Sequence, residues 1–307
     1  MGYKLAGYHH LGGVELDPRV ADTYKRNHHP EMLYIEDIRD FNKRTDLPEV
    51  LYDLDILDGS PPCSTFSTAG SRDKAWGKEK QFDEGQKLQR LDDLVFVYCD
   101  TIERLKPKVC WLENVSGLVK GNAKAYAKEI VKRLNEIGYN VQVFLLNGAT
   151  MGVPQIRERC FFIGLRKEFH LPKLVLNFNE RPILFGEIID RSETKRDLNE
   201  VQLDVWKRQK PNDYTFADVR GYPNGFNDIL VSSHRICNTL TSNGKFICKE
   251  YPRWFNQDEF CKVGTFPIDY DFGDKGPQWY VGMSVPPVMT AQISYQIYKQ
   301  WLTKIKK

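Results

Sequence analysis

The sequence predicts an α/β protein with a doubly wound, mostly parallel sheet and a second, smaller irregular domain. In the first half of the 307-residue chain, short apolar runs alternate with amphipathic stretches, as in β-α-β units. After about residue 166, Pro, Asn, Asp and aromatic residues become frequent, and strong helical periodicity is absent until Thr290. We therefore expect one domain over 1–169 and 278–307, and a second over 170–277.

The individual elements follow from apolar patterning and from turn residues. Pro18 stands at the first turn of one predicted helix, and Gly138 ends another. A long polar stretch over 64–85 contains glycines and many charges, and a loop of this length in a compact domain is usually functional. Strands are expected at 10–16, 32–35, 54–57, 108–112, 141–146 and 160–165, and helices at 18–27, 88–105, 123–137 and 290–302.

Composition excludes several classes of protein. The chain has 44 Lys and Arg against 41 Asp and Glu, so it is not a histone-like coating protein, although a local basic groove is compatible with this balance. No apolar run approaches the roughly 18 residues of a membrane helix, and no secretory signal precedes the first predicted strand. The seven cysteines are scattered without a C-x-x-C pair, which favours a reducing compartment such as the cytoplasm. A zinc module of His234, Cys237 and Cys248 lacks metal-ligand spacing.

Cys63 is a candidate nucleophile. It follows a predicted strand and is preceded by Pro61 and Pro62, which stiffen the approach. In open α/β sheets, ligands bind beyond the carboxyl ends of the strands. A buried structural cysteine is the commoner explanation for a single cysteine. The prolines, the polar flank and the long loop that follows favour the reactive alternative.

Other polar residues lie at predicted strand ends. Glu113 follows a buried strand, and alternation places Gln155, Arg157 and Arg159 on one face before another. Each of these features alone also fits a helix cap or a solvated charged face. Glu15 resembles the acid that binds ribose hydroxyls in nucleotide-binding α/β folds.

Taken together and in this order, these segments resemble the DNA (cytosine-5) methyltransferases of the restriction–modification type. The resemblance covers nearly the whole chain, and it implies a Rossmann-like methyltransferase sheet with a target-recognition domain over 170–277. The matching segments are Glu15-Leu16-Asp17-Pro18, Asp37-Ile38, Pro61-Pro62-Cys63, Glu113-Asn114-Val115, Gln155 to Arg159, Arg235 to Ser242, Phe260 to Phe272, and Gly282 to Pro287.

The resemblance implies transfer of a methyl group from S-adenosylmethionine to carbon 5 of a flipped cytosine at a specific short sequence in double-stranded DNA. Cys63 would form the covalent adduct, and Glu113 would share a proton with the base. Arg157 and Arg159 would hold the base, with Arg159 nearest, and the loop over 64–85 would close on it. No metal is implied. The cofactor-binding residues would be Glu15 at the ribose, Leu16 and Ile38 beside the adenine, Asp37 at its amino group, and Pro62, Leu94, Ser284 and Val285.

Two departures from the family pattern leave alternatives open. The family's first strand and glycine turn are not visible before Glu15, which indicates a truncated or misplaced start, a strand supplied by another polypeptide, or a decayed enzyme. Met283 stands where the family usually has asparagine. The alternatives to a DNA methyltransferase are an inactive or split-subunit DNA-binding relative, and an RNA cytosine methyltransferase. A bacterial or phage-derived cytoplasmic enzyme with a cognate restriction endonuclease is the setting that the resemblance implies.

Overall fold

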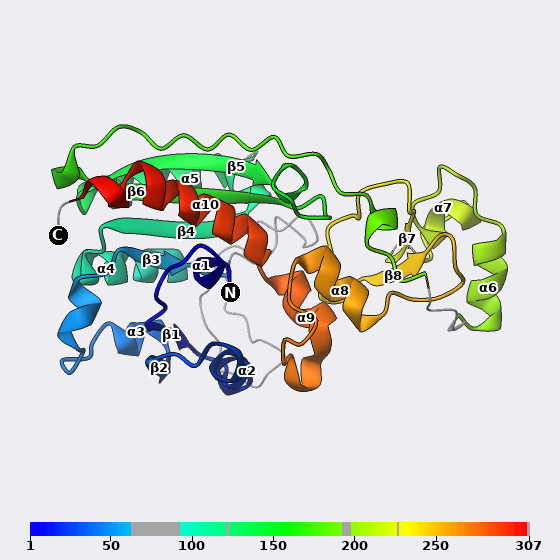
Figure 1. Cartoon of the computed structure of the whole chain (residues 1–307), viewed down its shortest axis with the longest axis horizontal. Coiled ribbons are helices and arrows are strands. Elements are labelled where there is room, and N and C mark those ends of the chain that lie inside the picture. The colour runs from blue at the N-terminus through cyan, green and yellow to red at the C-terminus, as the bar shows by residue number, and fades with distance from the viewer. Residues whose placement is uncertain (63–92, 121–122, 192–197, 226, 306–307) are drawn as a thin grey trace.

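A computed structural model describes residues 1–62, 93–120, 123–191, 198–225 and 227–305. Figure 1 shows two groups of elements, one built around the longest strands and one containing α6, α7, β7 and β8. Within the described ranges, no helix is long and apolar enough to cross a membrane. The polar segment 64–85 and the beginning of the helix expected over 88–105 lie outside the described residues.

The largest sheet contains β3 (Ile56–Gly59), β4 (Val109–Val115), β6 (Glu158–Arg166) and β5 (Tyr139–Asn147), in the order β3-β4-β6-β5. β3 is parallel to β4, whereas β6 is antiparallel to both of its neighbours. β5 and β6 are joined without a crossover helix, and strands connected in this way run in opposite directions. The sheet is therefore mixed, with a parallel and an antiparallel part.

A second, two-stranded parallel sheet is formed near the N-terminus by β1 (Gly12–Glu15) and β2 (Met32–Ile35). α2 (Pro18–His28) connects them, and the Asp17 carboxylate caps it by accepting from the backbone N–H of Arg19. Two one-turn helices, α1 (Gly2–Leu5) and α3 (Ile38–Phe41), flank this pair. Side chains of both parallel pairs share one apolar cluster, which contains Val14, Tyr34, Leu57 and Leu105.

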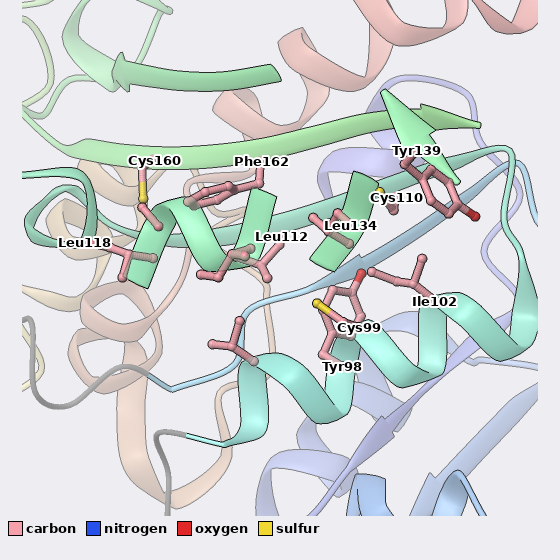
Figure 2. Close-up of a cluster of buried hydrophobic side chains, with 13 residues drawn as sticks. Tyr98, Cys99, Ile102, Cys110, Leu112, Leu118, Leu134, Tyr139, Cys160 and Phe162 are labelled. Atoms are coloured by element: carbon pink, nitrogen blue, oxygen red, sulfur yellow. The ribbon is translucent and has the colours of Figure 1, made fainter. Parts of the chain in front are cut away.

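Helices cover both faces of the four-stranded sheet. α4 (Leu94–Leu105) and α5 (Lys124–Glu136) cover one face, where Cys99, Ile102, Leu112, Leu134 and Phe162 pack together (Figure 2). α10 (Pro287–Gln300), with α1 packed on it, covers the other face against Trp111, Phe161 and Ile163. Successive residues of β4 and β6 thus point to opposite cores, as strand alternation requires.

The region after residue 185 has a separate apolar core that contains Phe185, Phe246, Phe255 and Phe260. Its elements are α6 (Glu200–Lys207), α7 (Phe216–Arg220), β7 (Asp228–Val231), β8 (Lys245–Cys248), α8 (Gln257–Gly264) and α9 (Gly276–Met283). These helices were not expected from the sequence, since each is too short to show clear periodicity. Their local signals are capping boxes, in which Asn199, Thr215 and Asn256 begin α6, α7 and α8.

Candidate active site

A buried ion pair joins the two central strands of the large sheet. In the antiparallel register, Arg159 of β6 lies opposite Val115 and Glu113 of β4 lies opposite Phe161, so both charged side chains share the α10 face. Arg159 Nε lies 3.1 Å from Glu113 Oε1, and the two side chains are 15% and 12% exposed. The structure therefore brings together the acid and one of the arginines that the sequence predicted as site residues.

The environment of Glu113 favours its protonated form. Burial raises the pKa of Glu113 above its ordinary value, while the Arg159 charge, a hydrogen bond with the Ser60 side chain and the Arg157 charge act to lower it. Ser60 follows the carboxyl end of β3, which pairs with β4 through Gly59 and Leu112. Glu113 is thus a partly shielded carboxyl group, held between a hydroxyl and a guanidinium, that retains a proton to higher pH than a solvated glutamate.

The end of β4 is tied to the segment that leads to Cys63. Asn114 is 5% exposed, and its Nδ2 donates to the carbonyl oxygen of Pro61 at 3.1 Å. Its Oδ1 accepts from the backbone N–H of Val115 at 2.9 Å. Cys63 itself lies outside the described residues, so its proximity to Glu113 remains a prediction from the sequence.

The six other cysteines are buried. Burial raises the pKa of the Cys99 and Cys160 thiols to about 12 and that of Cys261 to about 11. Cys160 lies on β6, and its thiol donates to the carbonyl oxygens of Asn114 and Val115. A thiol with a raised pKa is a poor source of thiolate at neutral pH, so these cysteines are structural.

Arg157 occupies a different environment from Arg159. It is fully buried, and its guanidinium donates to the carbonyl oxygens of Leu240 at 2.9 Å and Gly282 at 2.8 Å. It also donates to the side-chain oxygen of Gln155 at 3.2 Å. Burial lowers the pKa of Arg157 to about 9, with the neighbouring Arg159 charge acting in the same direction.

Two predicted cofactor ligands lie at the carboxyl ends of β1 and β2. Glu15 pairs with Ile35 in the strand register, and Asp37 follows two residues later. Glu15 Oε1 accepts from the backbone N–H of Asp17 at 2.9 Å, and burial raises the pKa of Glu15. The Asp37 carboxylate caps α3 and lies 3.2 Å from Arg39 Nη1. Both carboxylates therefore share one end of this sheet, beyond the strand termini.

The remaining predicted cofactor residues are spread over several elements. Ile38 packs against the α4–α5 core, and Val285 packs against the α10 core. The Ser284 hydroxyl donates to the Tyr280 carbonyl oxygen at 2.6 Å. Leu16 and Leu94 are half-buried, whereas Pro62 is exposed. Met283, which replaces the family's usual asparagine, is 65% exposed.

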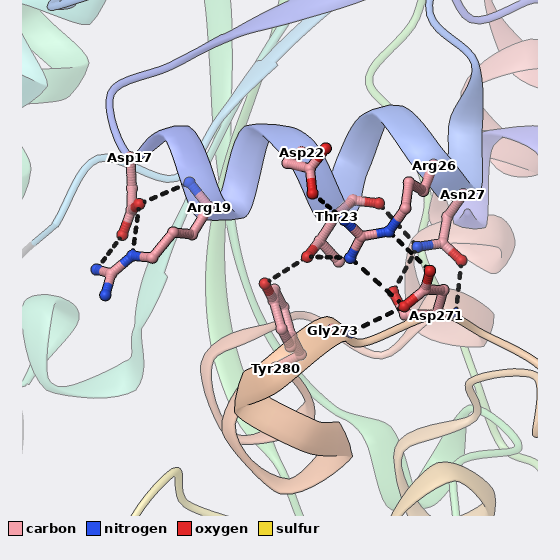
Figure 3. A network of polar contacts seen from close by, with 9 residues as sticks. All are labelled: Asp17, Arg19, Asp22, Thr23, Arg26, Asn27, Asp271, Gly273 and Tyr280. Atoms are coloured by element: carbon pink, nitrogen blue, oxygen red, sulfur yellow. Dashed lines mark hydrogen bonds and ion pairs between the residues drawn. The ribbon is translucent and has the colours of Figure 1, made fainter.

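A polar network holds α2 against α9 and the segment before it (Figure 3). The Tyr280 hydroxyl donates to Thr23 Oγ1 at 2.8 Å in a buried contact. Arg26 Nε lies 2.7 Å from Asp271 Oδ2, and Asn27 Nδ2 donates to the Asp271 carbonyl oxygen at 2.8 Å. The network fixes the helix that follows Glu15 against a segment more than 240 residues away in the sequence.

Ser60 contributes to this site without having been expected there. Asn114 and Gln155 also contribute, although the sequence indicated them only as neighbours of the candidate residues. Each lies directly beside, or two residues from, a residue that the sequence analysis selected. The available signal was their position at a strand end, which a polar residue shares with many surface turns. In the described part of the chain, no group of three or more His, Cys, Asp or Glu side chains is arranged to hold a metal ion.

Comparisons with known proteins relate the chain to one family. The family model for the C-5 cytosine-specific DNA methylase matches residues 1–299. The type II methyltransferase M.Sau96I of Staphylococcus aureus is 32% identical over 315 residues, covering 93% of this chain and 70% of the relative. M.DdeI of Desulfomicrobium norvegicum is 33% identical over 178 residues, covering 57% of this chain. The match spans only 40% of M.DdeI, less than two thirds of its length.

The fold has a counterpart among solved structures. The Dnmt2 methyltransferase of S. pombe superimposes with a TM-score of 0.62 over 97% of this chain and 94% of that chain, at 14% sequence identity. At this level of identity the similarity supports the α/β fold and carries no information about the substrate.

Proposed function

Because this chain belongs to the C-5 cytosine-specific DNA methylase family, we propose that it methylates carbon 5 of cytosine in double-stranded DNA at a specific short sequence. The methyl donor in this proposal is S-adenosylmethionine, and the reaction proceeds through a covalent adduct with Cys63. The observation that carries the proposal is the buried Glu113–Arg159 pair, whose strand is hydrogen-bonded through Asn114 to the residue before Pro62-Cys63.

The chemistry requires a nucleophile because carbon 5 of cytosine is itself unreactive. The Cys63 thiolate adds to carbon 6, and the electron pair displaced from the C5–C6 bond makes carbon 5 nucleophilic. As the ring gains electron density, Glu113 donates its proton to ring atom N3. After carbon 5 has taken the methyl group, water accepts the proton lost from carbon 5, and the electron pair of that C–H bond re-forms the C5–C6 double bond. The C–S bond breaks and releases the Cys63 thiolate, and N3 returns its proton to Glu113.

Glu113 and Arg159 are suited to this task by their environments. The raised pKa of Glu113 keeps a larger protonated fraction available near neutral pH than an ordinary glutamate has. Arg159 orients this carboxyl group through the contact at 3.1 Å and places a positive charge beside it. A base inside a duplex cannot reach these groups, so the target cytosine must be extruded, which costs a few kcal/mol.

The donor set at the ends of β1 and β2 fits S-adenosylmethionine. When bound, this cofactor supplies a methyl group activated by a sulfonium centre. The Glu15 carboxylate is an acceptor suited to ribose hydroxyls, and the Asp37 carboxylate is an acceptor suited to an adenine amino group. Apolar contacts would come from Leu16, Ile38, Leu94 and Val285, with Pro62 and Ser284 at the boundary.

We assign residues 1–169 and 278–307 to the catalytic domain and 170–277 to target recognition. The separate core around Phe185 and Phe246 supports two domains. The side chains of Leu174 and Leu176, just after residue 169, still pack with the large sheet. In this proposal, the catalytic sheet is the doubly wound methyltransferase type, and polar side chains of the second domain read base edges and phosphates.

The biological setting in this proposal is a bacterial or phage-derived cytoplasmic restriction–modification system. Its supporting observation is that the matching relatives are type II methyltransferases. The partners are double-stranded DNA and a cognate restriction endonuclease.

The test is expression of the chain in a host without cytosine C5 methylation, followed by bisulfite sequencing of the host DNA. We expect methylation confined to one short sequence, and we expect Cys63→Ser to abolish it while leaving DNA binding intact. Absence of methylation with retained DNA binding would favour the inactive or split-subunit alternative. Methylated cytosine in RNA, with none in DNA, would favour the RNA alternative.

A further inference from the structure

Three segments that are distant in the sequence meet at the side chains of Gln155 and Arg157. Both residues are fully buried, immediately before β6. Gln155 forms a parallel bridge with Cys237, and the backbone N–H of Ile156 donates to the Cys237 carbonyl oxygen at 2.9 Å. The backbone around Cys237, in the proposed recognition domain, therefore runs beside the residues that immediately precede β6, the strand that carries Arg159.

The side chains extend this contact to a third segment. Gln155 Oε1 accepts from the Leu240 backbone N–H at 3.0 Å, and Arg157 donates to the Leu240 carbonyl oxygen. The second terminal nitrogen of Arg157, Nη2, donates to the carbonyl oxygen of Gly282, near the end of α9. A Cβ atom on Gly282 would lie 2.2 Å from the Ser242 backbone nitrogen, so these two backbones are in close contact.

No carboxylate in the described ranges forms an ion pair with Arg157, and its Nε has no hydrogen-bond partner there. Its charge is thus stabilised mainly by backbone carbonyl dipoles from the recognition segment and α9. A lysine has a single terminal nitrogen and cannot reproduce this forked geometry. Any shift of Leu240 or Gly282 changes the position of the guanidinium.

Arg157 is also close to the catalytic pair along the strand. It precedes Arg159 by two residues, a spacing that places both side chains on one face. The backbone of Arg157 is held on both sides, since its N–H donates to Asn147 Oδ1 at 3.2 Å and its carbonyl oxygen accepts from Gly148 at 3.0 Å.

We propose that Arg157 is a positioning residue, which transmits the placement of the recognition segment 237–242 and of α9 to the Glu113–Arg159 pair. This inference rests on the proposed methyltransferase function. It assigns Arg157 a role through Arg159 instead of direct contact with the target base. A displacement of about 1 Å at a reacting group can cost about 100-fold in rate, so loss of this anchor should slow the chemical step.

The test compares Arg157→Lys with a matched control, Arg104→Lys. Arg104 also binds backbone carbonyl oxygens, those of Phe41 at 2.9 Å and Asn42 at 2.8 Å, but on the catalytic side only. Each variant is assayed for thermal stability, for DNA affinity as a function of salt, and for the single-turnover rate of methyl transfer to a duplex that the wild type methylates.

We expect Arg157→Lys to slow methyl transfer by about 100-fold with little change in DNA affinity or its salt dependence, whereas Arg104→Lys retains the wild-type rate. A wild-type rate for Arg157→Lys would overturn the proposal. Uniformly weaker DNA binding with a salt slope smaller by about one would also overturn it, because that result indicates a phosphate contact.

A second variant keeps the proposal testable where Arg157→Lys does not fold. Gln155→Met preserves the side-chain volume and leaves Arg157 in place, but removes the oxygen shared by Leu240 and Arg157. We expect a smaller loss of rate, of about tenfold, at unchanged DNA affinity. If this variant transfers methyl groups at the wild-type rate, the proposed coupling is wrong. An inactive wild type would instead contradict the proposed function itself.

Discussion

Removal of Arg159 should raise the pKa of Glu113 further, and this effect is measurable without DNA. The substitution Arg159→Met keeps a long apolar stem and removes the charge 3.1 Å from Glu113 Oε1. Burial, which already raises the pKa of Glu113, would then be opposed only by the Ser60 side chain and the more distant Arg157 charge.

The size of the effect follows from Coulomb's law. At 3.1 Å and an effective dielectric constant of about 20, the attraction between Glu113 and Arg159 is about 5 kcal/mol, which is an upper bound because the charged pair is desolvated. A carboxyl group beside an arginine usually has its pKa lowered by about one to three pH units. We therefore expect Arg159→Met to raise the pKa of Glu113 further, because the charge that lowers it is lost while the burial that raises it remains.

The assay is a pH titration of ¹³C-labelled glutamate carboxyl groups by NMR, with the Glu113 signal assigned by its absence in Glu113→Gln. A control variant, Lys120→Met, removes a more exposed lysine that pairs with Glu158 at the start of β6 and should leave the Glu113 titration unchanged. An unchanged or lower Glu113 pKa in Arg159→Met would refute the account of how this pair is tuned. In active protein, a higher Glu113 pKa should keep Glu113 protonated to higher pH. Any loss of methyl transfer that is caused by its deprotonation should therefore occur at higher pH.

Three further predictions concern the supports of the site. Asn114→Ala should lower the free energy of unfolding by about 1–3 kcal/mol, as measured by urea denaturation, because it leaves the Pro61 carbonyl oxygen without its donor; unchanged stability would contradict this. Tyr280→Phe removes the buried hydrogen bond to Thr23 and should lower the free energy of unfolding by about 1 kcal/mol. Calorimetry should show weaker binding of S-adenosylmethionine at unchanged DNA affinity. An unchanged cofactor affinity would show that this network does not support the cofactor site. Burial lowers the pKa of His28 to about 3, so the unfolded chain binds a proton below about pH 6.5 that the folded protein excludes, and stability should fall by about 2 kcal/mol between about pH 7 and pH 5. His28→Leu should remove that part of the pH dependence in urea titrations, and the exposed His9→Leu should retain it.

Local patterning predicted most of the elements that surround the site. Apolar runs located β2, β5 and β6 closely, and Pro18 marked the beginning of α2. The strand expected to end at Leu112 continues to Val115, because Glu113 and Asn114 still pair with β6 through their backbones. Because Glu113 and Asn114 are polar, the apolar pattern did not indicate that the strand continues through them. The candidate acid, Glu113, lies in this last part of β4.

Long-range contacts were less accessible from the sequence. Alternation placed Arg157 and Arg159 on one face, but it did not indicate that Arg159 meets a carboxylate while Arg157 meets backbone carbonyl oxygens. The direction of β6 depends on how the chain returns after β5, which apolar patterning alone does not encode. The cofactor residues remain predictions from the resemblance, apart from the placement of Glu15 and Asp37 at one sheet end.

The shielding of the six structural cysteines has a practical consequence for labelling the protein. A maleimide or iodoacetamide reagent reacts with thiolates that it can reach, and these six sulfur atoms are enclosed by the folded chain. Brief treatment of the native protein should consequently leave these six cysteines unmodified. A label introduced through a thiol elsewhere would not require their replacement.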